Sequence, residues 1–384
     1  MFDASGLPEG FKMPTTMPDG SPFDISKLNG GQQQEPLDPM EQLRRKNNRE
    51  NYKKMRGLPS MKMLTICITT YNRPDLLEKA LADLCTIQQN PPLFKVLVVD
   101  DCSSVEYNIP DDVVKKLDLK YIKLKKNGGP GVARQTGIDN CDTTWITFMD
   151  DDDKIGANIN TLIQTELYQD NFKLIRTPFA EVDGENISTV TEDISYNHGK
   201  VFNMNTIKKY HIHFPDFRVF EDVYFNLSYF FICEYEKTVR DCDYSFYGYL
   251  ENKESITRKQ GIDFMENNFE FYCRARMDPA KMLLKKFPKA FEVLRIHLLN
   301  VMADEYLFIQ LFKYRKSKNT ERYTKIVRDD LKYICRKLDL DSDGLSRMVY
   351  GNMKTFEAIC KDFHNRFEFE ESEDIHKFLG RLLR

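Results

Sequence analysis

Four consecutive aspartates, Asp150 to Asp153, directly follow the apolar run WITFM. Neighbouring carboxylates repel one another, and the repulsion grows where a strand end is shielded from water. A hard divalent cation, Mg²⁺ or Mn²⁺, would offset this charge, because such ions prefer carboxylate oxygens and complete their shell with water and substrate phosphates. The alternative is an acidic surface turn or helix N-terminus, where aspartates serve as caps.

The four aspartates are not expected to be equivalent. Side chains two residues apart on an extended strand point the same way. Asp150 and Asp152 are therefore expected to face one site, and Asp151 is expected to point away from it. On this reasoning Asp151→Ala should be mild and Asp152→Ala severe.

Polar side chains also follow two earlier apolar runs, LTICI and FKVLVV. They are Thr69, Thr70, Tyr71, Asn72 and Arg73 after the first run, and Asp100 and Asp101 after the second. Because the carboxyl ends of parallel strands meet at one edge of a sheet, these clusters and the four aspartates should line one crevice.

The segment KNGGPGVARQTG would supply the positive side of this crevice. Its glycines let backbone N–H groups approach an anion, the following helix offers its N-terminus, and Arg134 lies one turn into that helix. The candidate residues here are Asn127, Gly128, Gly129 and Arg134. The pattern is neither GxxxxGK[ST] nor GxGxxG, which disfavours kinase-type and dinucleotide-type sites.

Strands and helices alternate from Met63 onward. Apolar strands are expected at 63–71, 94–104, 120–126, 144–153 and 172–182, with helices between them. Near-continuous apolar strands that alternate with helices are typical of a mostly parallel α/β sheet. We expect a flexible N-terminal arm at 1–60, an α/β domain at 61–260 and a helical domain at 261–384.

The composition narrows the class of protein. The 384 residues are 41% hydrophobic, and their formal charge of −3 gives no global attraction to nucleic acid or anionic membrane. Nine scattered cysteines fit a reducing compartment. Since no apolar run reaches about 18 residues and no signal peptide is evident, we expect a cytoplasmic protein, with a membrane-peripheral position left open.

The four blocks ICITTYNRPDLLEKAL, VLVVDDCSS, NGGPGVARQTGI and WITFMDDDD resemble, in order and nearly in spacing, the signature blocks of family 2 glycosyltransferases with the GT-A fold. The resemblance covers about residues 63 to 258 and implies a nucleotide-diphosphate-sugar donor, most simply a UDP-sugar, with the aspartates as a DxD-type motif for Mn²⁺ or Mg²⁺. It implies the following roles: Thr69, Tyr71 and Asp101 at the base and ribose, Arg134 near the diphosphate, and Asp150, Asp152 and Asp153 at ribose and metal. The same resemblance adds four residues to the expected donor-binding set: Asn72, Arg73, Asp100 and Asp151.

The segment HFPDFRVFEDVYFNLSYF resembles the family's later block, in which an acidic pair opens a helix that faces the acceptor. The resemblance implies Asp222 as the general base of an inverting transfer, with Glu221 as its nearest competitor. Arg258, in SITR, resembles a late residue that reaches the donor phosphates. His211 and His213 look like a metal pair, but no third ligand of matching spacing is evident, which favours a structural or acceptor-lining role.

Two other hypotheses remain at this point. A sugar-phosphate nucleotidyltransferase should have a glycine-arginine-rich loop after the first strand, and TTYNRPDLL contains no glycine. A non-catalytic scaffold of the same fold is disfavoured because the acids are present. The acceptor stays open among glycan, lipid, protein and nucleic acid. The helical tail is a candidate surface for an acceptor, a membrane surface or a second subunit, although its basic segment favours a solvated face.

Overall fold

The computed structural model describes residues 63–169, 171–184, 186–191, 193–250 and 261–383. By its contacts the chain divides into two compact units, Met1–Arg218 with Thr238–Lys253, and Val219–Lys237 with Glu254–Arg384. The expected boundary at residue 260 differs from this division in one helix, Glu221–Glu236, which groups with the helical unit. The expected arm at 1–60 lies outside the described residues.

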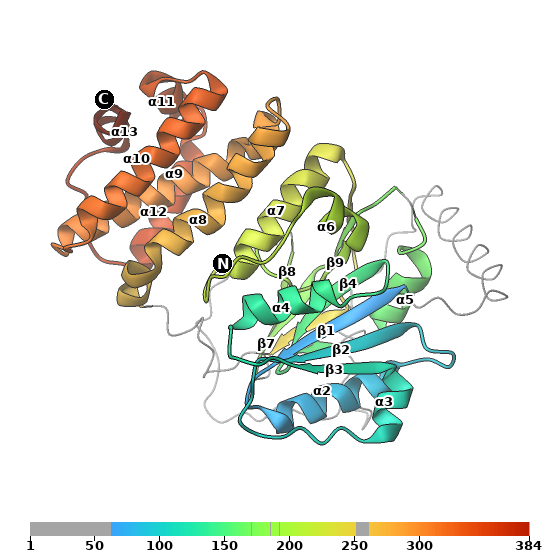
Figure 1. Cartoon of the computed structure of the whole chain (residues 1–384). Coiled ribbons are helices and arrows are strands. Elements are labelled where there is room, and N and C mark those ends of the chain that lie inside the picture. The colour runs from blue at the N-terminus through green and yellow to red at the C-terminus, as the bar shows by residue number, and fades with distance from the viewer. Residues whose placement is uncertain (1–62, 170, 185, 192, 251–260, 384) are drawn as a thin grey trace. The chain divides into compact units, whose positions relative to one another are not determined.

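The first unit is built on a seven-stranded, mostly parallel sheet (Figure 1). Its strands, in spatial order, are β10 (Val239–Asp241), β6 (Leu174–Arg176), β9 (Lys200–Asn203), β4 (Trp145–Asp150), β1 (Leu64–Thr70), β2 (Phe94–Asp100) and β3 (Leu119–Lys123). β1 to β4 are mutually parallel, and β9 runs antiparallel to β4 and β6. The expected α/β class is confirmed.

Helices cover both faces of this sheet, with α2 and α3 on one face and α4 on the other (Figure 1). The helices are α2 (Pro74–Ile87), α3 (Asp111–Leu117), α4 (Pro130–Asp139), α5 (Asn158–Thr165) and α6 (Met204–Tyr210). Prolines at the start of α2 and α4 fix the backbone angle that a helix needs where no N–H is required. Since both faces are covered, β1 is buried along its whole length.

A second, four-stranded sheet lies in the same unit, in the order β5 (Lys154–Ile155), β11 (Tyr247–Leu250), β7 (Phe179–Asp183) and β8 (Asn186–Val190). The strand expected at 172–182 is divided between the two sheets: β6 belongs to the first and β7 to the second. The break falls at Thr177–Pro178, where proline has no N–H to continue a ladder.

Helix α4 packs closely on β1 because Gly137 has no side chain. A Cβ atom at position 137 would lie 2.3 Å from Sγ of Cys67. We predict that Gly137→Ala lowers the free energy of unfolding by about 1 to 3 kcal/mol, the usual cost of overpacking a core. Chemical denaturation would measure it, and Cys67→Ala in the same chain should restore most of the loss. A tolerated Gly137→Ala would contradict this close approach.

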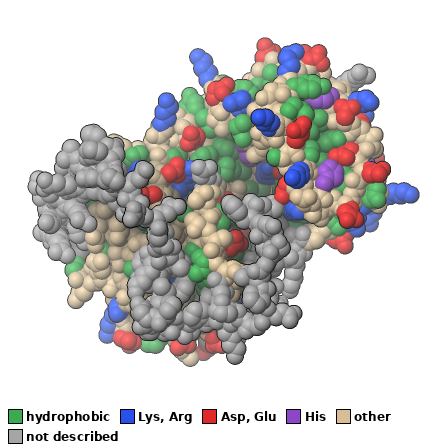
Figure 2. All heavy atoms as spheres, turned by 180° about the vertical axis from the view of Figure 1, so that it is seen from behind, with side chains coloured by type: hydrophobic (Ala, Val, Ile, Leu, Met, Phe, Trp, Pro, Cys, Tyr) green, Lys and Arg blue, Asp and Glu red, His purple; other side chains and the backbone are tan. Residues whose placement is uncertain are grey.

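The second unit is helical. Its helices are α7 (Glu221–Glu236), α8 (Ile262–Lys286), α9 (Phe291–Tyr314), α10 (Thr320–Leu338), α11 (Ser342–Tyr350), α12 (Met353–Arg366) and α13 (Ile375–Leu383). Aromatic side chains fill its core: the ring of Phe269 lies 5.1 to 5.5 Å from those of Phe308, Phe312 and Tyr323. Among the described helices, none is both long and apolar enough to span a bilayer. On the face of this unit seen in Figure 2, basic and acidic side chains are interspersed.

His297 of α9 makes this helical unit sensitive to acid. Burial, with Arg276 nearby, lowers the pKa of His297 from 6.5 to about 3, and its Nε2 lies 2.8 Å from the carbonyl oxygen of Arg276. Because the unfolded chain binds this proton more tightly, the free energy of unfolding falls as pH drops below 6.5, by about 1.4 kcal/mol per pH unit.

We predict that His297→Gln, which keeps a donor for that carbonyl, reduces the stability lost between pH 7 and pH 5 by about 2 kcal/mol. Urea unfolding of both proteins at the two pH values would measure it. An unchanged loss would mean that His297 is not the group that takes up the proton on unfolding.

Candidate functional site

The carboxyl ends of β1, β2 and β4 lie side by side. In the sheet register Thr70 pairs with Asp100 of β2, and Thr69 pairs with Asp150 of β4. The Thr69 hydroxyl donates to Oδ1 of Asp150 at 3.3 Å. The three polar clusters that the sequence places after separate strands therefore meet at one edge of the sheet.

The loop after β1 is fastened to the loop after β2. Asn72 has a left-handed backbone, with φ of 54°, and its Oδ1 accepts a hydrogen bond from the Ser104 N–H at 2.8 Å. The Asn72 N–H donates to Oγ of Ser103 at 2.8 Å. Tyr71, between β1 and Asn72, is 45% exposed, so its ring is available to a ligand.

Asp100 and Asp101 have different surroundings. Asp100 is fully buried, and its two carboxylate oxygens accept from the Ser103 N–H at 2.8 Å and the Tyr121 hydroxyl at 2.6 Å. Asp101 accepts from the N–H groups of Gly128 and Gly129, both at 2.7 Å. The anion that meets these two N–H groups is thus the carboxylate of Asp101, and the Asn127 side chain donates to the carbonyl oxygen of Asp101 at 3.3 Å.

Both glycines are required for this loop. Gly129 has a φ of 85°, in the left-handed region that favours glycine, and it precedes α4 directly. A Cβ atom on Gly128 would lie within 2.7 to 2.9 Å of the Val132 side chain. The loop therefore brings α4 close to the strand ends, and α4 in turn presents Arg134.

Arg134 is buried and points to the first aspartate. Its Nη2 donates to Oδ1 of Asp150 at 2.7 Å. Burial acts to raise the pKa of Asp150, but the guanidinium groups of Arg134 and Arg73 act against it, and that pKa lies below its ordinary value. Asp150 is consequently an anion near neutral pH.

Asp151 and Asp152 share one cation, the guanidinium of Arg73. Nη2 of Arg73 lies 2.5 Å from Oδ1 of Asp151, and Nη1 donates to Oδ2 of Asp152 at 2.8 Å. Asp151 is only 2% exposed and also accepts from the Thr70 hydroxyl at 2.6 Å. Burial raises the pKa of Asp151 to about 7, although Arg73 acts against this. Because Asp151 is buried against Thr70 and Arg73, we now expect Asp151→Ala to be damaging and not mild.

The fourth aspartate approaches the first. The Asp153 N–H donates to the carbonyl oxygen of Asp150 at 3.0 Å, so the chain turns directly after β4. Oδ2 of Asp153 accepts from the Tyr247 hydroxyl at 2.5 Å and Oδ1 from the Leu250 N–H at 3.0 Å. Burial, together with Asp150, raises the pKa of Asp153 well above its ordinary value.

His198 completes a group of three donors. One ligand atom each from Asp150, Asp153 and His198 lies within 4.8 Å of the others. The imidazole stacks on Tyr247, with ring centres 5.0 Å apart, and burial lowers its pKa to about 4, so it is neutral and offers a lone pair. Among the described residues its buried Nδ1 has no hydrogen-bond partner.

These three side chains fit a divalent cation. Two carboxylate oxygens and one imidazole nitrogen are hard and borderline ligands, the kind of set that Mn²⁺ accepts and that Mg²⁺ accepts less readily. A bound cation would favour the deprotonated form of Asp153, whose raised pKa otherwise keeps it protonated. The structure thus brings Asp150 together with Asp153 and His198, whereas Asp152 lies against Arg73.

The expected catalytic pair opens α7 in the helical unit. Glu221 is 5% exposed, whereas Asp222 is partly exposed, and Oδ1 of Asp222 accepts from the Val223 N–H at 2.8 Å. Of the two, Asp222 is thus the more open to a substrate. Arg258 lies outside the described residues.

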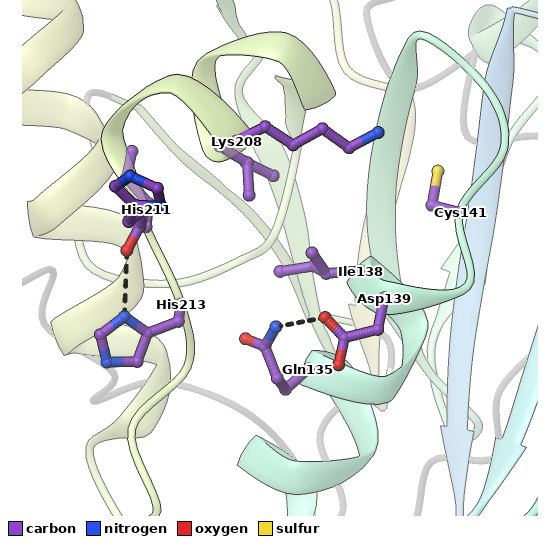
Figure 3. Close-up of a pocket in the computed structure, with 9 residues that line it drawn as sticks. Gln135, Ile138, Asp139, Cys141, Lys208, His211 and His213 are labelled. Carbon is purple, nitrogen blue, oxygen red and sulfur yellow. Dashed lines mark hydrogen bonds between the residues drawn. The ribbon is translucent and has the colours of Figure 1, made fainter.

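A cavity of about 500 Å³ lies between α4 and the segment after α6 (Figure 3). Gln135 and Asp139 from α4 and Lys208, His211 and His213 line it. Nδ1 of His213 lies 3.1 Å from the carbonyl oxygen of His211, so the two rings do not converge on a common point (Figure 3). This geometry favours the lining role over a metal pair.

Sequence reasoning missed His198 and Tyr247. His198 stands alone in YNHGK, and Tyr247 is one of many aromatic residues in YSFYGYL. Neither has a neighbour at metal-ligand spacing, so no local signal could have identified them. His198 comes just before β9, which pairs with β4 in the first sheet, and Tyr247 begins β11 of the second sheet, so two different sheets bring them to the aspartates.

Comparison with known proteins gives a family match for the region that carries the strand-end aspartates. Residues 65–178 match the model of glycosyl transferase family 2. Over 100 residues the chain is 37% identical to the succinoglycan biosynthesis protein ExoW of Rhizobium meliloti (24% of this chain, 30% of ExoW). Over 97 residues it is 32% identical to the poly(ribitol-phosphate) beta-N-acetylglucosaminyltransferase TarS of Staphylococcus aureus (25% of this chain, 17% of TarS). The matches span less than a third of either relative.

The fold is also shared with a solved structure. The crystal structure of S. aureus TarS 1-349 in complex with UDP superposes with a TM-score of 0.52, over 80% of this chain and 93% of that one, at 16% identity. This likeness confirms the expected GT-A-like α/β core with a helical C-terminal region. The family model covers β1 through β6, so the match to glycosyltransferase family 2 lies in the part of the chain that forms most of the first sheet.

Proposed function

We propose that this protein is an inverting, metal-dependent glycosyltransferase that moves a sugar from a UDP-sugar to an acceptor hydroxyl. The observation that carries the proposal is the strand-end crevice, in which a group of cation donors lies beside Arg134 in a chain that matches this family. The relatives support the choice of donor: TarS is named a beta-N-acetylglucosaminyltransferase, and a crystal structure of TarS 1-349 is a complex with UDP. UDP-GlcNAc is therefore the first donor to test.

In the proposed site, Asp150, Asp153 and His198 hold Mn²⁺, or less favourably Mg²⁺. Asp152 is the remaining candidate ligand. A bound divalent cation would stabilise the charge on the departing diphosphate. Thr69, Tyr71 and Asp101 are proposed to bind base and ribose, with Asn72 and Asp100 fixing the loops. Arg134 is proposed to turn from Asp150 toward the diphosphate once a cation neutralises that carboxylate.

The proposed transfer is an in-line displacement. The acceptor oxygen forms a bond to the anomeric carbon, the bond from that carbon to the UDP oxygen breaks, and its electron pair leaves with UDP. Asp222 takes the proton of the acceptor hydroxyl. One displacement at the anomeric carbon inverts its configuration.

Calorimetry with UDP and Mn²⁺ tests the donor site without knowledge of the acceptor. We expect UDP to bind in the presence of Mn²⁺ and to bind much more weakly with EDTA. UDP-GlcNAc with a panel of glycan, lipid, protein and nucleic-acid acceptors, read by mass shift, then tests transfer. Failure to bind UDP or any other nucleoside diphosphate with metal present would overturn the proposal.

A further inference from the structure

Strand β11 orients two of the three cation donors. Its first residue, Tyr247, donates its hydroxyl to Oδ2 of Asp153, and its last, Leu250, donates its N–H to Oδ1 of the same carboxylate. Each oxygen of Asp153 thus accepts one hydrogen bond from the second sheet. Two such bonds fix both the position and the plane of a carboxylate.

The ring of Tyr247 also fixes His198. The two rings stack with centres 5.0 Å apart and planes 22° apart, and Nε2 of His198 faces Oδ2 of Asp153 at 3.8 Å. Tyr247 is 1% exposed, so its own position is set by the core of the first unit. One buried side chain therefore contacts both donors, through its hydroxyl and through its ring.

The backbone of β11 ties this arrangement to the aspartate turn. Tyr247 and Gly248 pair with Ile155 and Lys154 of β5, which directly follows Asp153. The same strand pairs with β7 on its other side. Movement of Tyr247 relative to Asp153 would require two ladders to deform, which makes the pair a rigid support.

We propose that Tyr247 is a positioning residue for the metal site, which holds Asp153 and His198 in the geometry that a divalent cation requires. The inference rests on the proposed function, since it assumes that these donors take a cation. Hydrogen-bonded partners of metal ligands orient those ligands, and their loss typically lowers metal affinity by 10- to 100-fold.

Tyr247→Phe removes the hydroxyl and keeps the ring over His198. Tyr249→Phe is the matched control, because the Tyr249 ring stacks on the same imidazole with centres 4.9 Å apart and belongs to the same strand. Titration with Mn²⁺, with and without UDP, can be followed by the electron paramagnetic resonance of free Mn²⁺. We expect Tyr247→Phe to weaken Mn²⁺ binding by at least about 10-fold and Tyr249→Phe by less than about 2-fold.

The melting temperature of each metal-free protein separates positioning from stability. A Tyr247→Phe protein that melts earlier but binds Mn²⁺ as tightly as wild type would overturn the inference, and so would equal losses in the two variants. If Tyr247→Phe alone is too unstable to titrate, it is combined with Asp153→Asn and compared with Asp153→Asn alone. Because the hydroxyl of Tyr247 acts through Asp153 and the Phe ring stays over His198, the combined variant should lose no more Mn²⁺ affinity than Asp153→Asn, and an added loss would contradict action through Asp153. Wild type that binds UDP but takes no Mn²⁺ overturns the metal site, whereas wild type that binds neither overturns the function as well.

Discussion

Asp150→Asn should weaken Mn²⁺-dependent UDP binding by at least about 100-fold, a loss above that seen when a hydrogen-bonded partner of a ligand is removed. The pKa of Asp150 lies below its ordinary value, and Asp150 belongs to the three-donor group. The amide has no negative charge to offer a cation, and Arg134 loses its carboxylate partner. Calorimetry with UDP at fixed Mn²⁺ would measure the loss.

The matched control is Asp142→Asn. Asp142 lies in the same unit, its side chain is 68% exposed, and it pairs with Lys95 at the surface. This change should leave UDP binding at the wild-type value. A circular-dichroism spectrum like that of wild type is required of both variants, and wild-type UDP and Mn²⁺ affinity in Asp150→Asn would remove Asp150 from the metal site.

The general position of the site could be predicted from the sequence because it depends on a property of parallel sheets. Apolar strands that end in polar residues place those residues at one edge, and the register does pair Thr70 with Asp100 and Thr69 with Asp150. No long-range information is needed for that step. The Gly128–Gly129 loop was also identifiable, because consecutive glycines before a helix indicate a tight approach.

The roles within the aspartate run could not be predicted from spacing. The expectation that Asp150 and Asp152 point the same way assumed an extended chain, but β4 ends at Asp150 and the Asp153 N–H bonds back to its carbonyl. In this turn residues three apart approach each other. Asp153 therefore joins Asp150, and Asp151 and Asp152 are left to Arg73.

The contribution of His198 and Tyr247 to the site could not be predicted from the sequence for a different reason. His198 and Tyr247 are separated from the aspartates by more than 40 residues. The approach of Tyr247 depends on the pairing of β11 with β5 and β7, and that of His198 on the pairing of β9 with β4. A short strand such as β5, of two residues, has no periodicity to detect. Only the folded chain shows that Tyr247 contacts both Asp153, through its hydroxyl, and His198, through its ring.

Asp222→Asn should lower the turnover of glycosyl transfer by about 10²- to 10⁴-fold, the usual contribution of a general base. UDP and Mn²⁺ should bind to it as they bind to wild type, because the change removes only the group that accepts the proton. Turnover with a saturating acceptor, compared with UDP affinity from calorimetry, would separate the two. Glu234→Gln, an exposed change on the same helix α7, is the control and should be silent.

A variant of Glu221 tests whether Glu221 or Asp222 is the general base at the start of α7. It is buried, so Glu221→Gln is expected to act on stability and to leave much of the turnover of the folded fraction. If Glu221→Gln instead loses turnover at unchanged stability while Asp222→Asn keeps it, the base is Glu221. Should both folded variants transfer sugar at the wild-type rate, the proton must leave by another group, and the acidic pair serves only to stabilise the positive end of the helix.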